Sequence, residues 1–142
     1  MATSSTAKYQ LCMAGEYGVC SELSKRGFNV SMTLGNAKGV DVWALRKDMS
    51  YARIEVKTTR GNSFVTGFFQ KYDDISNPNH PDYWVLVHID ANNISHYYVL
   101  THKEMGDLQM ARNGMASWGP VKGVDNVPLR QVKKYEDDWG KI

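Results

Sequence analysis

The sequence lacks several features that would identify a specialised class of protein. Only two of its 142 residues are cysteines, and the spacing of Cys12 and Cys20 matches no zinc or redox motif. On one helix these two residues would lie about 12 Å apart, too far for a disulfide. No apolar run approaches the roughly 20 residues of a membrane span, and the opening MATSSTAKYQ lacks the apolar core of a secretory signal. We therefore expect a cytoplasmic protein with reduced cysteines.

A strong charge imbalance is also absent. The formal net charge is +2, from 17 basic and 15 acidic residues, so nucleic-acid binding is allowed but not required. The hydrophobic content of 42% is that of an ordinary globular protein, and 142 residues suit one domain with a real core. No segment resembles a linker between domains. We predict a single domain over residues 1–142, with residues 1–7 disordered.

The pattern of apolar residues predicts an α/β fold. A helix is expected over residues 8–26, and Gly27 is a usual stop signal after it. Further elements are predicted as strands at 28–34, 40–46, 51–59, 83–89 and 95–101 and as a helix at 102–112. Residues 64–76 are ambiguous and partly helical in character.

The tetrapeptide KGVD occurs twice, at residues 38–41 and 122–125. The first copy runs into a predicted strand. The second runs into Asn-Val-Pro, and a central strand does not tolerate proline. We interpret the second copy as a loop and the repeat as a coincidence.

The first helix carries a carboxylate on its apolar side. Three residues fall within about 40° of one another at 100° per residue: Cys12, Val19 and Leu23. Glu16 lies on the same stripe, where a carboxylate costs several kcal/mol unless it is paired or binds a cation. Pairing with an arginine is the structural alternative. Gly15 and Gly18 flank Glu16 and weaken the helix by roughly 1 kcal/mol each, which would be offset if they allow close approach to a sheet.

The stretch RIEVKTTRG, residues 53–61, places charged side chains on one face of a predicted strand. Alternation puts Ile54, Val56 and Thr58 on one face, and Arg53, Glu55, Lys57 and Thr59 on the other. A solvated strand face and a metal-and-lysine site both fit this pattern. One acid-x-Lys match is expected by chance in roughly every chain of this length, so its context has to decide.

That context includes Asp41, which shares a predicted strand face with Trp43 and Leu45. Aspartate is disfavoured in strands, and a cap at the strand start is the structural alternative. A hairpin that turns near residues 48–49 places position 41 opposite positions 55–57, and the register, which the sequence leaves open, decides whether Asp41 joins Glu55 and Lys57. Opposed or diagonal neighbours are close enough to share an ion, and two carboxylates with Mg²⁺ form a hard-oxygen site.

Together these residues resemble the PD-(D/E)XK nuclease superfamily, which has an Asp on its second strand and (Asp/Glu)-x-Lys on its third. The matches are Asp41 in GVDVWA, Glu55 and Lys57 in IEVKTT and, for a helical Glu that many members add, Glu16 in AGEYGVCSELSKRGF. The opening GEYGVCSELSKRGFNV is similar to small stand-alone bacterial members and to archaeal Holliday-junction resolvases. The resemblance covers residues 8–59 well and 83–112 loosely. Val40 stands where the motif name has proline, which removes no ligand.

The resemblance implies a restriction-endonuclease-like αβββαβ core, with a mixed central sheet flanked by helices. It implies that Asp41 and Glu55 coordinate Mg²⁺, or Mn²⁺ in its place, with the Val56 carbonyl and with Glu16 directly or through water. Lys57 would orient the attacking water or stabilise charge in the transition state. Gln70 would be an accessory active-site residue, and a surface polar residue is its alternative reading.

The function that the resemblance implies is Mg²⁺-dependent hydrolysis of phosphodiester bonds in DNA, with branched or structured DNA as a candidate substrate. A homodimer is expected, with an interface at strands 83–89 and 95–101 or at the tail carrying Tyr135 and Trp139. Two other classes stay open: a nuclease-fold module that has lost catalysis and binds nucleic acid or protein, and a subunit whose protein partner supplies specificity.

Other candidate residues carry weaker signals. Four cations that border the expected site are phosphate-contact candidates or scattered surface charge: Lys38, Arg46, Lys47 and Arg60. The four histidines make no metal-binding pair at helical spacing and are interpreted as loop or strand residues: His80, His88, His96 and His102.

Overall fold

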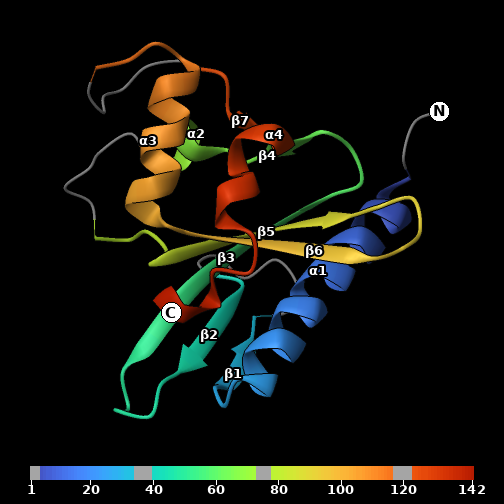
Figure 1. Cartoon of the computed structure of the whole chain (residues 1–142), viewed down its shortest axis with the longest axis vertical. Coiled ribbons are helices and arrows are strands. Elements are labelled where there is room, and N and C mark those ends of the chain that lie inside the picture. Colours follow the sequence, from blue (N-terminus) through green and yellow to red (C-terminus); the bar gives the residue numbers. More distant parts are fainter. Residues whose placement is uncertain (1–3, 34–39, 73–77, 117–122) are drawn as a thin grey trace.

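The computed structural model describes residues 4–33, 40–72, 78–116 and 123–142. Its centre is a five-stranded sheet in the order β1-β2-β3-β5-β6, formed by β1 (Asn29–Met32), β2 (Val42–Leu45), β3 (Tyr51–Thr59), β5 (Tyr83–Ile89) and β6 (Ser95–Thr101). Two long helices, α1 (Ser5–Lys25) and α3 (His102–Arg112), cover it (Figure 1). The expected mixed sheet flanked by helices is confirmed.

Short elements complete the fold. They are β4 (Ser63–Val65), α2 (Phe68–Lys71), β7 (Asn126–Pro128), α4 (Leu129–Val132), η1 (Lys133–Tyr135) and η2 (Trp139–Lys141). β4 and β7 form a separate two-stranded antiparallel sheet. Among the described residues, no helix combines the length and apolar character needed to cross a bilayer.

The central sheet contains antiparallel pairs and a parallel pair. β1, β2 and β3 form an antiparallel meander, and β6 pairs with β5 as an antiparallel hairpin. β5 runs parallel to β3, and a parallel pair requires a long crossover. That crossover contains β4 and α2, so it brings α2 back over the sheet beside β3.

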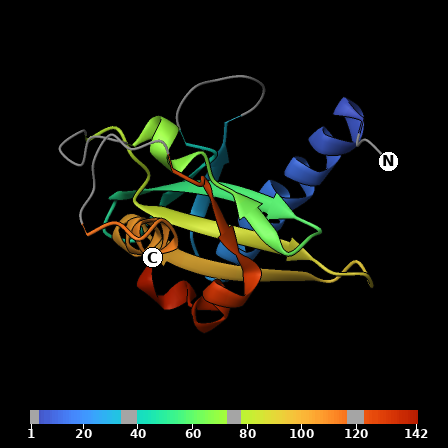
Figure 2. The ribbon, with the colours of Figure 1, turned by 90° about the horizontal axis from the view of Figure 1, so that it is seen from above.

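The two faces of the sheet are buried by different helices (Figure 2). The α1 face is aliphatic: Val19, Leu23, Val42, Ala44, Ala52, Ile54, Val56, Val85, Val87, Ile89 and Val99 pack there with Trp139. The opposite face is aromatic and lies under α2 and α3: Phe64, Phe68, Phe69, Trp84, Leu86, Tyr98, Leu100, Met105, Val127 and Val132. β5 is buried on both faces, which explains why its sequence YWVLVHI does not alternate.

The glycines of α1 allow the close approach that the sequence suggested. A Cβ atom at Gly15 would lie 1.8 Å from Thr58 Oγ1, and one at Gly18 would lie 2.4 Å from the Tyr97 hydroxyl oxygen. A larger residue at either position would require the helix or the neighbouring side chain to shift. The close packing sets the distance between α1 and β3 and therefore the position of Glu16.

Several boundaries differ from those predicted. α1 begins at Ser5 because the Ser4 side chain caps it, accepting a hydrogen bond from the Ala7 amide at 3.1 Å. Residues 5–7, expected to be disordered, are therefore helical, and residues 1–3 lie outside the described part. Cys12 is exposed rather than core-facing. β2 begins at Val42 instead of residue 40 and leaves Asp41 just outside it.

The second KGVD copy ends in a loop, as predicted, with residue 122 outside the described part and 123–125 in no regular element. The Asn-Val-Pro that follows nevertheless forms β7. Each strand of a two-stranded sheet has a free edge, where the N–H group that proline lacks is not needed for a hydrogen bond.

The expected dimer interface is wrong in two places. β5 is the central partner of β3 and β6 and has no free edge. Trp139 is 4% exposed and packs against Tyr97, with ring centroids 5.5 Å apart. β6 ends the sheet, but Tyr98 already forms a bridge with Glu136 of the C-terminal segment.

Candidate active site

The main chain of β3 holds Asp41 in place. The Asp41 amide donates to the Ile54 carbonyl at 3.1 Å, and the Val56 amide donates to Asp41 Oδ2 at 2.8 Å. Val42 pairs with Ile54, so the same register places Asp41 opposite Glu55. This confirms the hairpin pairing predicted from the sequence. The carboxylate takes the place of the next β2 main-chain group and so ends the ladder beside β3.

Glu55 is a buried carboxylate with two cationic partners. Its side chain points to the face opposite α1, and the residue is 3% exposed. Its Oε1 atom lies 3.1 Å from Lys57 Nζ and 3.5 Å from Lys71 Nζ. A buried carboxylate requires such pairing, because an unpaired charge there is strongly destabilising. Both lysines contact the same oxygen atom, so these ion pairs leave Oε2 uncommitted.

Glu16 joins this group from α1. Its carboxyl group makes a side-chain hydrogen bond with Asp41, not with an arginine. Burial, the Asp41 charge and that hydrogen bond raise the pKa of Glu16 to about 7, with a further contribution from the charge of Glu55. Burial and the Glu55 charge also raise the pKa of Asp41, although the Val56 amide opposes this. The three predicted acids therefore interact electrostatically in one place.

The oxygen atoms at this site are of the kind that binds a hard divalent cation, with the protein supplying only a few of the ligands. Among the described residues, no three His, Cys, Asp or Glu side chains are arranged to hold a metal ion. The candidate donors are the carboxylates of Asp41 and Glu55 and the Val56 carbonyl, with Glu16 beside Asp41 as a further acid. In an extended strand the N–H and C=O groups of one residue point to the same side, so the Val56 carbonyl lies on the side of β3 where the Val56 amide contacts Asp41. Oxygen donors of this kind suit Mg²⁺, which keeps several water ligands.

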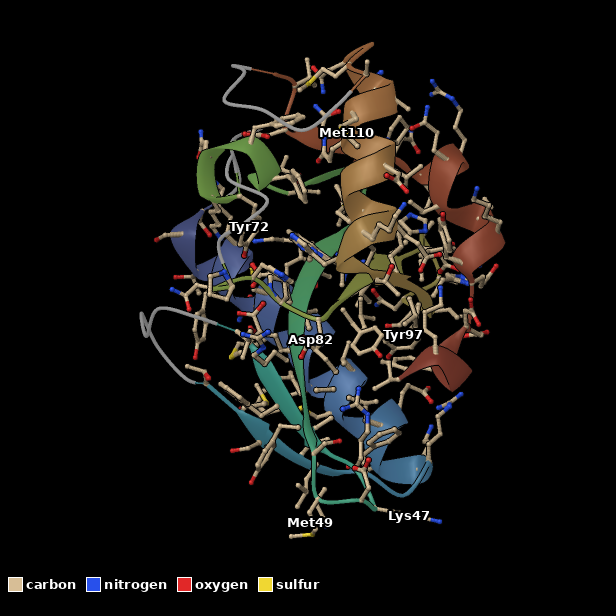
Figure 3. The ribbon with its side chains drawn as sticks, turned by 90° about the vertical axis from the view of Figure 1, so that its left-hand side faces the viewer. Lys47, Met49, Tyr72, Asp82, Tyr97 and Met110 are labelled. Carbon is tan, nitrogen blue, oxygen red and sulfur yellow. The ribbon has the colours of Figure 1, made fainter. Side chains whose placement is uncertain are left out.

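Two residues that the sequence did not single out border the site. Burial and the charges of Glu55 and Asp41 raise the pKa of the Tyr72 phenol. Lys71, which contacts Glu55, ends α2. Figure 3 shows Tyr72 beside α2, with Lys47 and Met49 at the far end of the β2–β3 hairpin. No motif marks Lys71 or Tyr72, because only the crossover brings residues of the ambiguous segment 64–76 to β3.

Gln70 also lies on α2, and its side chain is exposed. Its neighbour Lys71 makes the contact with Glu55. An accessory role for Gln70 stays a prediction.

The other candidates have mainly structural surroundings. Arg46 donates to the Ile142 carbonyl at 3.1 Å and to the Tyr83 hydroxyl at 3.3 Å. It therefore links Ile142 to the β2–β3 hairpin. Lys47 and Arg60 are exposed, and Lys38 lies outside the described residues. His102 is a buried core residue whose Nδ1 accepts a hydrogen bond from the Trp84 indole at 3.0 Å.

Comparisons with known proteins identify the fold. The sequence matches no protein-family description and no curated protein. Among solved structures, the chain is similar to the bacterial homing endonuclease I-Ssp6803I, with a TM-score of 0.59 and 13% sequence identity over 99% of this chain and 91% of that one. At this identity the likeness concerns the fold alone. The chain therefore folds like a known endonuclease structure over nearly its whole length.

Proposed function

We propose that this protein is a metal-dependent endonuclease that hydrolyses phosphodiester bonds in DNA and belongs to the PD-(D/E)XK nuclease superfamily. The observation that carries the proposal is the contact between Asp41 and the β3 main chain, which places that carboxylate beside Glu55 and Lys57. The fold shared with a homing endonuclease supports the same reaction class, although a shared fold alone does not establish an activity.

In the proposed site, Asp41, Glu55 and the Val56 carbonyl hold Mg²⁺ or Mn²⁺, and Glu16 adds a ligand directly or through water. The bound ion would polarise the scissile phosphate and lower the pKa of a coordinated water molecule. Each carboxylate has a separate support. The Val56 amide orients Asp41, and the Lys57 ammonium group orients Glu55.

Lys57 supplies a fixed positive charge where negative charge grows during hydrolysis. A water oxygen attacks phosphorus, the bond to the leaving sugar oxygen breaks, and that oxygen takes up a proton. Lys57 is less exposed than Lys71, with 25% and 51% of the side chains exposed. It projects from the middle of the sheet, where the strand backbone fixes its direction. A preorganised charge of this kind stabilises the transition state more than the ground state.

The assembly and the substrate form the finer part of the proposal. Cutting both strands of a duplex needs two sites, so we propose a symmetric homodimer, with a protein partner as a further source of specificity. Branched or structured DNA is a candidate substrate beside duplex DNA. Sedimentation with and without DNA tests the dimer, and a monomer in both conditions would contradict it.

A panel of single-stranded, duplex, flapped and branched DNAs tests the activity. Wild-type protein should nick at least one of them in Mg²⁺ or Mn²⁺ and none in EDTA. Asp41→Asn and Glu55→Gln should each abolish the nicking, while Asp107→Asn, an exposed aspartate on α3, should retain it. If the protein binds DNA but never cuts it, the chain is a binding module with a nuclease fold.

A further inference from the structure

Glu55 has more positive charge around it than its burial requires. Lys57 Nζ lies 3.1 Å from Oε1 and would by itself pair the buried carboxylate. Lys71 Nζ lies farther from the same atom, at 3.5 Å, and half of its side chain is exposed. Loss of the Lys71 contact would therefore not leave Glu55 as an unpaired buried charge, which is the costly case. Lys71 can therefore leave Glu55 for another partner. Lys57 can leave Glu55 without that cost only when another cation takes its place.

A buried polar network holds the helix that carries Lys71. The Phe69 amide donates to Asp125 Oδ1 at 2.7 Å, and the Thr66 amide donates to the Asp125 carbonyl at 2.8 Å. Gln109 is fully buried, bonds to the Thr66 hydroxyl and donates to the Val124 carbonyl at 3.1 Å. Asp125 belongs to the second KGVD copy. The loop that contains the second KGVD copy thus holds α2 next to β3.

The short helix α2 depends on these polar contacts for its position. α2 has four residues and no side-chain cap of its own, and an isolated helix of this length would not be stable. Its position is therefore imposed by the core and by Asp125. Phe68 and Phe69 anchor its apolar side, which leaves Lys71 at the end directed to Glu55. The fold thus keeps the ammonium group of Lys71, on a half-exposed side chain, beside the site.

We propose that Lys71 is a phosphate-binding residue. When DNA occupies the site, its ammonium group moves from Glu55 Oε1 and forms an ion pair with a non-bridging phosphate oxygen of the nucleic-acid backbone. The inference rests on the proposed function, because it identifies Asp41 and Glu55 as the place where the scissile phosphate lies. Lys57 and Lys71 then have different roles. Lys57 stays with Glu55, and Lys71 contacts the DNA already in the ground state.

The salt dependence of DNA binding tests this role without any cleavage. A labelled duplex oligonucleotide is titrated with protein in EDTA, by fluorescence anisotropy, over a series of salt concentrations from about 50 to about 200 mM. Each phosphate contact contributes about 0.9 to the negative slope of log K against log salt on duplex DNA. Lys71→Ala should reduce the magnitude of that slope by about 0.9 and weaken binding most at low salt. Lys71→Arg should retain the slope.

Three controls isolate the Lys71 effect. Lys71→Gln keeps much of the aliphatic stem and should behave as Lys71→Ala does, which excludes a packing cause. Lys103→Ala, which removes an exposed α3 lysine paired with Asp107, should leave the slope unchanged. Melting temperatures confirm that each variant is folded.

The outcomes separate this inference from the proposed activity. A slope equal to that of wild type in Lys71→Ala, or the absence of duplex binding by wild type, overturns the phosphate contact even if the protein cuts DNA. The expected loss of slope in a protein that never nicks DNA supports the contact and counts against the nuclease. An equal loss in Lys103→Ala also overturns the proposal, because the effect would then be one of general charge.

Discussion

The backbone amide of Val56 and the carboxylate of Asp41 are joined by a hydrogen bond of 2.8 Å. The carboxylate thus takes the place that a main-chain carbonyl of β2 would otherwise occupy. This contact explains why an aspartate is found at the end of a strand, where its intrinsic preference is poor. The Val56 contact commits only Oδ2, and Asp41 also makes a side-chain hydrogen bond with Glu16.

Asp41→Asn should therefore separate metal binding from folding. The asparagine oxygen can still accept the Val56 hydrogen bond, so the variant should fold. Wild-type protein should gain melting temperature in Mn²⁺, since a ligand that binds only the native state stabilises it by about 2.7 kcal/mol at 100-fold its Kd. Asp41→Asn should lose most of this gain and Asp107→Asn none of it. Equal gains in Asp41→Asn and wild type would show that the ion binds elsewhere.

The close packing of Gly15 on Thr58 leads to a prediction about stability. Alanine at position 15 would place Cβ 1.8 Å from Thr58 Oγ1, and such overpacking typically costs about 1–3 kcal/mol. Alanine also favours the helix by roughly 1 kcal/mol. We expect a net loss of up to about 2 kcal/mol in urea denaturation, together with slower DNA cleavage, because Glu16 moves with the helix.

Two variants control for this effect. Gly15→Ala combined with Thr58→Ala should recover part of the lost stability, since the clashing oxygen is removed. Gly140→Ala should be close to wild type, because a Cβ there meets no atom within 4 Å. If Gly15→Ala stabilises the protein as a simple helix substitution does, the close contact is not a constraint.

Much of this fold could be predicted because its local patterns are unambiguous. The sequence reading placed β3, β5, β6 and α3 at the residues where the structure has them. Alternation in 51–59 and the apolar run of 83–89 are strong signals, and Thr101 and Glu104 form a capping box before α3. The hairpin turn predicts Asp41 opposite positions 55–57, but the register that brings its carboxylate beside Glu55 comes from the structure.

The rest depended on contacts between distant parts of the chain. β4 and β7 have three residues each and pair with one another. Strands this short show no alternation of apolar and polar residues from which they could be predicted. The position of α2 is set by Asp125, far along the sequence. Lys71 could not be assigned to the site without this contact. The expected interface at β5 was wrong. A strand buried inside a sheet and a strand buried between subunits have the same apolar sequence pattern, so the sequence does not distinguish them.

Acid should destabilise the protein through His102. Its Nδ1 accepts the Trp84 indole hydrogen, so the ring is neutral in the folded state. Burial and the adjacent His80 lower the pKa of His102 to about 4, aided by Arg53 and opposed by Asp82. The unfolded chain takes up the proton near pH 6.5. Stability contributed by this group is therefore present above about pH 6.5 and is lost as the pH falls toward 4, by up to about 3 kcal/mol.

Urea denaturation at a series of pH values checks this sign. His102→Gln retains an acceptor for the indole and should be less stable at neutral pH but lose less stability between pH 6.5 and 4. His88→Gln, on β5 opposite His96, should follow the wild-type curve. An acid dependence that is unchanged in His102→Gln would mean that other groups cause it.

The effect of Lys57→Ala on cleavage is the most direct test of the proposed nuclease. Single-turnover nicking of the best DNA substrate in Mg²⁺ or Mn²⁺ is compared with DNA affinity measured in EDTA. Lys57→Ala should slow cleavage by roughly 10²-fold or more, change affinity by less than about 1 kcal/mol and leave the protein folded, because Lys71 still pairs with Glu55. Cleavage at the wild-type rate in folded Lys57→Ala, or no cleavage by wild type of any DNA in either metal, would contradict the account.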